Sequence, residues 1–224
     1  IAKETGKLDL EQKLDSIRQS PAEIVFVSSA DTELAVLARI WGPKFGTRLR
    51  LMNASSLQHP EAAEYYADHV LVHAKMAIFR LHGGKAYFPK LLEEILHIKS
   101  HGIELKTLVL PGTDQWDPEL ASYNDYSESI SRTFFDYFRE GGLNNYQHAS
   151  DSLETLLNNL NQPFADAEQN PTFGWYQTRE SKKSDKSCGR VWITFYRAWQ
   201  QTGDLEVINQ LISELSSLGL EVSA

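Results

Sequence analysis

Four short apolar runs alternate with longer segments of helical periodicity along the first half of the chain. The runs are Ile24–Val27, Leu49–Met52, Met76–Leu81 and Thr107–Leu110. They contain few polar residues and do not alternate, which is typical of strands buried on both faces of a parallel sheet. Strands that alternate with helices in this way predict an α/β fold, here a flavodoxin-like parallel sheet flanked by helices and joined by right-handed crossovers.

The stretch from Ala22 to Trp41 contains a complete strand, loop and helix. Small and acidic side chains from Ser28 to Asp31 follow the strand and favour the start of a helix. Apolar residues then recur at helical spacing on one face, namely Leu34, Leu37, Ala38 and Trp41. Gly42 and Pro43 predict the end of this helix. In open α/β sheets ligands bind beyond the carboxyl ends of the strands, so the loops at that edge are where a site is expected.

The second half of the chain predicts two more helices and then the first βα unit of a second α/β domain. The acidic and aromatic segment Thr113–Tyr126 has no periodicity and is expected to be a long loop. Two apolar helical stripes follow it, with Ile130, Phe134 and Phe138 in the first and Leu153, Leu156, Leu157 and Leu160 in the second. A strand is predicted at Val191–Tyr196, before a helix with Leu205, Ile208, Ile212 and Leu215 on one face.

These elements predict five parts of the chain. They are an N-terminal arm at 1–20, the flavodoxin-like domain at 21–143, a helical connection at 144–176, a flexible linker at 177–189 and the start of a second α/β domain at 190–224. The linker is charged and has no apolar stripe. Because the chain begins with Ile1 and ends in a strand-like GLEVSA, we expect it to be a piece of a longer protein.

The charge and the cysteine content narrow the class of protein. With 30 acidic residues against 22 Lys and Arg, the formal net charge is -8, which disfavours nonspecific binding to nucleic acid or to an anionic membrane. The single cysteine, Cys188, excludes a disulfide within the chain, and no apolar run approaches the roughly 20 residues of a membrane span. A cytoplasmic protein without nucleic acid partners is expected.

The strongest local candidate for ligand binding is the turn after the third predicted strand. Arg80, His82 and Lys85 supply donors there, and Gly83 and Gly84 let the backbone approach a ligand. The alternative is a tight turn in which Arg80 pairs with an acidic neighbour. A Walker A loop is excluded, because its first glycine position holds a phenylalanine and an alanine follows the lysine.

Arg197, at the predicted end of the fifth strand, repeats this logic in the second domain. It could meet a carboxylate held between the domains or pair with an acidic residue across their interface. The pairs His69 with His73 and His97 with His101 have helical spacing but no third ligand nearby, so no metal site is predicted. The many aromatic residues between positions 116 and 138 are expected to belong to the core.

Taken together and in order, the motifs resemble those of a known family. They are PAEIVFVSSADTELAVLA, RLMNASSLQHP, AIFRLHGGKAYFPKLLEEI, VLPGTDQWDPEL, YFREGGLNN and VWITFYRAWQQTGDLEVINQLISELSSLGLEV. The ordered set, above all FRLHGG followed by LPGTD and FYRA, is similar to the N-terminal part of the large subunit (subunit N) of ATP-dependent cobaltochelatase, which is homologous to the H subunit of magnesium chelatase. The likeness runs over nearly all of the chain.

The resemblance implies a subunit that binds a tetrapyrrole while AAA+ ATPase partner subunits hydrolyse ATP to insert cobalt into hydrogenobyrinic acid a,c-diamide, in cobalamin biosynthesis. It implies that the chain acts with the rest of the large subunit, holds no cofactor or metal itself and has no catalytic residue of its own. The carboxylate and amide arms of a corrinoid are suitable partners for Arg80 and Arg197. Two alternatives stay open: a magnesium-chelatase-like porphyrin-binding subunit, and a flavodoxin-like binding module without any role in metal insertion.

Overall fold

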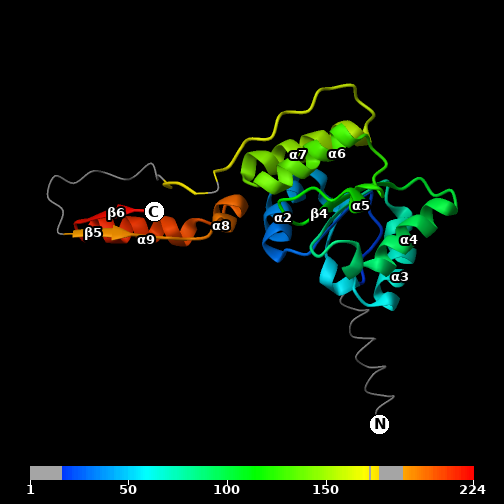
Figure 1. Cartoon of the computed structure of the whole chain (residues 1–224), viewed down its shortest axis with the longest axis horizontal. Coiled ribbons are helices and arrows are strands. Elements are labelled where there is room, and N and C mark those ends of the chain that lie inside the picture. Colours follow the sequence, from blue (N-terminus) through cyan, green and yellow to red (C-terminus); the bar gives the residue numbers. More distant parts are fainter. Residues whose placement is uncertain (1–16, 172, 177–188) are drawn as a thin grey trace, which may run out of the picture.

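The computed structural model describes residues 17–171, 173–176 and 189–224, and it forms two units of α/β structure (Figure 1). Most of the predicted N-terminal arm, most of the predicted linker and Cys188 lie outside the described residues. The start of the first unit is firmly packed, because Ile17 is 1% exposed and the Gln19 amide donates to the Leu51 carbonyl over 2.9 Å.

A four-stranded parallel sheet forms the centre of the first unit. Its strands are β1 (Ile24–Ser28), β2 (Leu49–Asn53), β3 (Met76–Leu81) and β4 (Lys106–Pro111), in the spatial order β2-β1-β3-β4. All three strand pairs are parallel. This order is that of the first four strands of a flavodoxin-like sheet, so the predicted fold class is confirmed.

Helices cover both faces of the sheet (Figure 1). One face packs against α2 (Asp31–Phe45), α6 (Glu128–Glu140) and α7 (Leu143–Leu157), and the other against α3 (Pro60–His69) and α4 (Pro89–Ser100). The step from β1 to β2 runs in one direction along the sheet and the next two steps run in the other. Crossovers of one hand must therefore place α2 on the face opposite α3 and α4, as observed.

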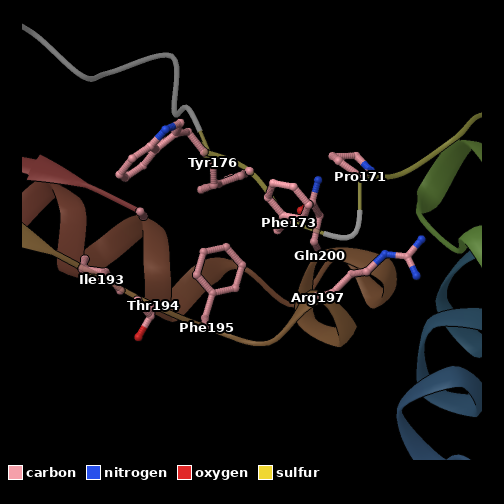
Figure 2. A pocket seen from close by; sticks show the side chains of 11 residues that line it. Pro171, Phe173, Tyr176, Ile193, Thr194, Phe195, Arg197 and Gln200 are labelled. Atoms are coloured by element: carbon pink, nitrogen blue, oxygen red, sulfur yellow. The ribbon is translucent and has the colours of Figure 1, made fainter.

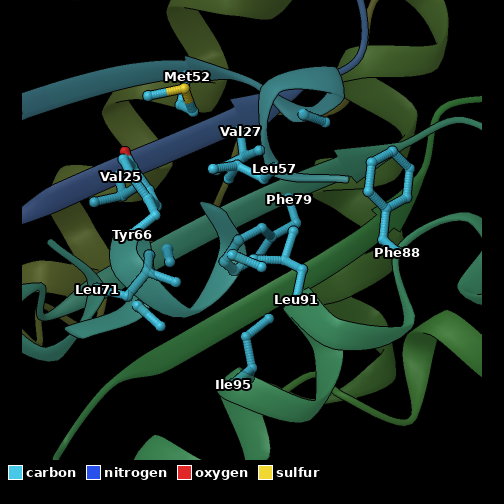
Figure 3. Packing of buried hydrophobic residues seen from close by; sticks show 14 of the residues in the cluster. Val25, Val27, Met52, Leu57, Tyr66, Leu71, Phe79, Phe88, Leu91 and Ile95 are labelled. Carbon is cyan, nitrogen blue, oxygen red and sulfur yellow. The ribbon is translucent and has the colours of Figure 1, made fainter. Parts of the chain in front are cut away.

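Each face has its own apolar core. Figure 3 shows the α3 and α4 side, where Val25, Phe79 and Leu91 meet between the sheet and the helices. On the other face the expected aromatic core is confirmed, since Phe134 and Phe138 are at most 1% exposed. The helix α7, most of which falls in the predicted helical connection at 144–176, lies in this same core, and the Trp41 indole donates to the Tyr146 carbonyl over 2.8 Å.

Short helical turns connect the main elements of the first unit. They are η1 (Gly46–Arg48), η2 (Ala54–Leu57), η3 (Leu71–His73), η4 (Lys85–Tyr87) and the four-residue helix α5 (Pro118–Ala121). The expectation that Thr113–Tyr126 is entirely loop is therefore wrong at α5, where the Asp117 carboxylate caps the helix by accepting from two backbone N–H groups. Such a short capped turn has no periodicity that a sequence pattern could reveal.

The free edge of β4 is closed by side chains of the loop after α5. The Thr107 N–H donates to the Asp125 carboxylate over 2.7 Å, and the Val109 N–H donates to the Asn124 side-chain oxygen. The next outward position on the strand is Pro111, which has no N–H. Because the outward donors are satisfied or absent, β4 offers little to a fifth strand, which is one way that proteins protect sheet edges.

Two features of α2 differ from the prediction. The helix continues through Pro43 to Phe45, and the Gly46 N–H closes its last turn on the Gly42 carbonyl. Proline removes only one helical hydrogen bond. Near the end of a helix that packs well on a sheet, this loss need not end the helix. The N-cap is Ala30, whose N–H donates to the Ser28 hydroxyl over 3.1 Å.

The second unit contains β5 (Gly189–Trp192), α8 (Arg197–Thr202), α9 (Glu206–Ser217) and β6 (Leu220–Ser223). The strands β5 and β6 pair in parallel, as a βα unit requires. The predicted strand Val191–Tyr196 is wrong at its end, because β5 can extend only as far as its partner pairs with it, which is to Trp192 opposite Ser223. Within the described part of the chain, no helix is long and apolar enough to cross a membrane.

Candidate functional site

The carboxyl ends of the central strands bring the predicted turn residues to one edge of the sheet. Ser28 of β1 lies opposite Asn53 of β2 and Arg80 of β3. The His82 N–H donates to the Ser29 hydroxyl over 3.3 Å, so the β1 and β3 loops are in contact. Both loops therefore contribute to one surface at the edge where parallel α/β sheets bind ligands.

Arg80 is directed into the helix layer and not toward solvent. Its guanidinium pairs with the Glu33 carboxylate, and the two side chains are 12% and 3% exposed. The Ser28 hydroxyl donates to the second oxygen of Glu33 over 2.5 Å, and the guanidinium lies 6.0 Å from the centre of the Phe138 ring. Of the two readings of Arg80, the structure therefore shows the ion pair with an acidic neighbour.

The turn that follows has the open backbone which its glycines predict. Gly83 and Gly84 have φ values of +88° and +69°, in the region that other residues rarely adopt. The His82 ring lies against the backbone at Gly112, where there is no room for a side chain. Partial burial lowers the pKa of His82, and the positive charge of Arg80 lowers it further against the opposing effect of Glu33. The lowered pKa favours the uncharged form of the imidazole.

Lys85 lies at the exposed end of the same turn. Its ammonium is 3.1 Å from the Glu119 carboxylate on α5, with side-chain exposures of 47% and 62%. The hydrogen bond to Glu119 raises the pKa of Lys85. An exposed ion pair of this kind is weak and exchanges readily, so the ammonium is accessible to an anionic ligand.

Arg197 lies at the junction between the two units, as the first residue of α8 and not at the end of a strand. Its Nη2 donates to the Glu140 carboxylate and to the Asn170 carbonyl, each over 2.9 Å. Its Nε is buried without a partner among the described residues. Of the two readings of Arg197, the pairing across the junction is thus observed, and one of its donors is left over.

Two cavities adjoin Arg197. One cavity, of about 630 Å³, extends from the loop after β4 to the junction between the units. It is lined by Asp114, Arg139, Glu140, Gln169, Asn170, Pro171 and Arg197. The other, of about 470 Å³, lies on the far side of the arginine and has aromatic walls, with Phe173, Tyr176 and Phe195 around it (Figure 2). Neither is lined by His82, Gly83, Gly84 or Lys85, so the structure does not bring the predicted residues into one pocket.

The aromatic pocket was missed by reasoning from the sequence. Apart from Ala224, its described lining comes from two segments, Pro171 with 173–176 and 193–200, that the sequence divides between two predicted parts. The available signal was the density of aromatic residues in PTFGWY, a segment without strand or helix periodicity. Aromatic residues there have no predicted core to enter.

The histidine pairs do not form a metal centre. The helix α3 ends at His69, so His73 lies in the next turn, and the His69 Nδ1 is 2.8 Å from the Tyr65 carbonyl oxygen. The rings of His97 and His101 are 4.3 Å apart at the end of α4. Among the residues that the structure describes, there is no group of three His, Cys, Asp or Glu side chains that could hold a metal ion.

No family model matches the chain. Aerobic cobaltochelatase subunit CobN from a Sinorhizobium species is 30% identical over 218 residues, which cover 90% of this chain and 17% of that subunit. The subunit of the same name from Pseudomonas aeruginosa is 28% identical over 214 residues, which cover 91% of this chain and 17% of that subunit. The chain thus spans about one sixth of the length of the curated relatives that it matches.

A solved structure has the same fold as this chain. The catalytic subunit of cobaltochelatase from Mycobacterium tuberculosis superposes with a TM-score of 0.63 and 18% identity, over 92% of this chain and 16% of that one. At this identity the superposition supports the fold, and the two sequence matches support the kinship. Over nine-tenths of its length, this chain is therefore related to a part of the aerobic cobaltochelatase subunit CobN.

Proposed function

We propose that this chain is part of the large, tetrapyrrole-binding subunit of an ATP-dependent chelatase, a ligase that inserts cobalt into hydrogenobyrinic acid a,c-diamide in cobalamin biosynthesis. The observation that carries the proposal is the match of 30% identity over 218 residues to the cobaltochelatase subunit CobN. Cobalt is the substrate of this reaction, and ATP is hydrolysed on separate AAA+ ATPase subunits in the cytoplasm. We assign no catalytic residue, no cofactor and no resident metal to the chain.

The role that we propose for the chain is to hold the arms of the corrinoid. Carboxylate and amide arms need hydrogen-bond donors and positive charge, which Arg197 and Lys85 supply at two places on the surface. The turn at His82, Gly83 and Gly84 adds an imidazole and an open backbone at the sheet edge. Arg80 is a positioning residue in this proposal, because its guanidinium is already paired with Glu33 beneath that edge.

The test is cobalt insertion by the full polypeptide encoded by the gene, together with its ATPase subunits. The absorbance change of the corrinoid on metallation measures the rate with and without ATP. Insertion of cobalt into the diamide that depends on ATP is the expected result. Insertion of magnesium into protoporphyrin would instead support the magnesium-chelatase alternative, and a complex that inserts neither metal would favour a binding module.

A further inference from the structure

We infer that the aromatic pocket beside Arg197 binds one edge of a flat, conjugated ring that carries an acidic arm. Phe173, Tyr176 and Phe195 provide the apolar walls, and Arg197 and Gln200 provide the polar end (Figure 2). The volume of about 470 Å³ lies within the roughly 300–1,000 Å³ of small-molecule sites. The inference deepens the proposed function and rests on it, because a tetrapyrrole is such a ring.

Two of the aromatic walls support each other, and the third is exposed. The rings of Tyr176 and Phe195 meet edge to face, with centres 5.8 Å apart and planes at 89°. Phe173 is 90% exposed. A large aromatic side chain that stays in water gains no burial energy, and such residues gathered at a concave surface are characteristic of binding sites. A flat ligand would cover the face of Phe173 by stacking.

The frame of the pocket is tied to the second unit. The Tyr176 N–H donates to the backbone oxygen of Ala224 over 2.6 Å, which attaches the segment of Phe173 to the residue that follows β6. The Tyr176 hydroxyl donates to the Asn209 side-chain oxygen over 3.0 Å. Because these bonds fix one wall against α9 and β6, the pocket is formed before a ligand arrives, which lowers the entropic cost of binding.

The polar end selects for an acidic arm. None of the described side chains that line the pocket is acidic, although the whole chain has a formal net charge of -8. Arg197 is anchored through Nη2 alone among the described residues, and its Nε is left without a partner. Because both Nη2 hydrogens already have acceptors and Nε is buried, an acidic arm would add one hydrogen bond, from Nη1, to the attraction of the positive charge.

The test measures corrinoid binding to the full polypeptide by the quenching of its tryptophan fluorescence. The probes are cobyrinic acid, whose arms are free carboxylates, and its heptamethyl ester, whose arms are uncharged. Phe173→Ala changes a side chain that is 90% exposed, and Leu218→Ala, at a residue that is 70% exposed, is the matched control. Neither substitution removes a core contact, so neither is expected to impair folding.

Phe173→Ala is expected to raise the Kd of both probes roughly 2-fold to 12-fold, the value of one aromatic pair, while Leu218→Ala leaves both unchanged. Arg197→Gln is expected to raise the Kd of cobyrinic acid and to leave the Kd of the heptamethyl ester unchanged. If Phe173→Ala and Arg197→Gln bind both probes like the unaltered protein, the pocket is not the site, yet the proposed function stands as long as cobalt insertion is observed. If the unaltered protein neither binds corrinoid nor inserts cobalt, both ideas are wrong.

Discussion

Arg80 and Glu33 form a buried ion pair beneath the carboxyl edge of the central sheet. They lie 47 positions apart in the sequence, and the pair joins β3 to α2 where the side chains are 12% and 3% exposed. The pair fixes the edge on which the turn from His82 to Lys85 lies. It therefore explains how an arginine at a strand end can matter for a site without touching a ligand.

Arg80→Ala is expected to destabilise the protein by about 3–5 kcal/mol, because it leaves the Glu33 carboxylate buried without its cation. Urea unfolding, followed by circular dichroism, gives the free energy. The matched control is Arg48→Ala, which removes an arginine that is 45% exposed from its pair with Glu23 and should cost about 0–1 kcal/mol. Equal losses in the two variants would mean that the Arg80 pair is no more than a surface contact.

Asp125→Asn should make the free energy of unfolding less sensitive to a fall in pH from 7 to 3. Burial raises the pKa of Asp125, but hydrogen bonds from Lys99 and from Thr107 outweigh it and leave the pKa below its ordinary value. A carboxyl whose folded pKa is depressed stabilises the fold above its unfolded pKa, about 3.9, and this contribution is lost as the pH falls through the folded pKa.

The measurement is the free energy of unfolding of Asp125→Asn and of the unaltered protein at pH 7 and at pH 3. At pH 7 the variant should be less stable by about 1.5–3 kcal/mol, the value of hydrogen bonds to a charged group, and the difference should shrink at pH 3. A difference that is the same at both pH values would show that the carboxylate charge does not hold the loop on β4.

Leu153→Ala tests whether α7 belongs to the first core or to a separate connection. Leu153 is 0% exposed, so its truncation should lower the free energy of unfolding by about 2–5 kcal/mol and shift the midpoint of a single unfolding transition to lower denaturant. Leu160→Ala, at a residue that is 49% exposed just after the helix, should change the free energy of unfolding by less than about 0.5 kcal/mol. A Leu153→Ala variant as stable as Leu160→Ala would support a domain that ends at residue 143.

Gly83→Ala should cost about 1–2 kcal/mol, because φ at this position is +88° and a methyl group would lie 2.6 Å from the Tyr87 ring. Gly42→Ala is the control inside α2, since apart from its own chain neighbours and helix backbone nothing lies within 4 Å of the added methyl group. That substitution should change the free energy of unfolding by less than about 1 kcal/mol, because the gain in helix propensity is offset by the crowding of Pro43 against the side chain before it. Thermal unfolding compares the two, and a neutral Gly83→Ala would contradict the strained turn.

The sheet could be predicted from the sequence because its strands are apolar on both faces and its helices carry apolar stripes, and these local patterns agree with the fold. The partner of Arg80 could not be predicted, because the pairing depends on how β3 and α2 pack together although the two residues lie 47 positions apart. The place of Arg197 was missed because the length of β5 is set by its pairing with β6. The aromatic pocket depends on the contact of two distant segments, which no local pattern encodes.

A structure of the full polypeptide with hydrogenobyrinic acid a,c-diamide bound would show directly whether this chain holds the substrate. One edge of the corrinoid should lie against Phe173 and Phe195, with an acid arm at the Arg197 guanidinium. A corrinoid that is bound without touching any residue of this chain would contradict the claim that this part of the subunit holds the substrate.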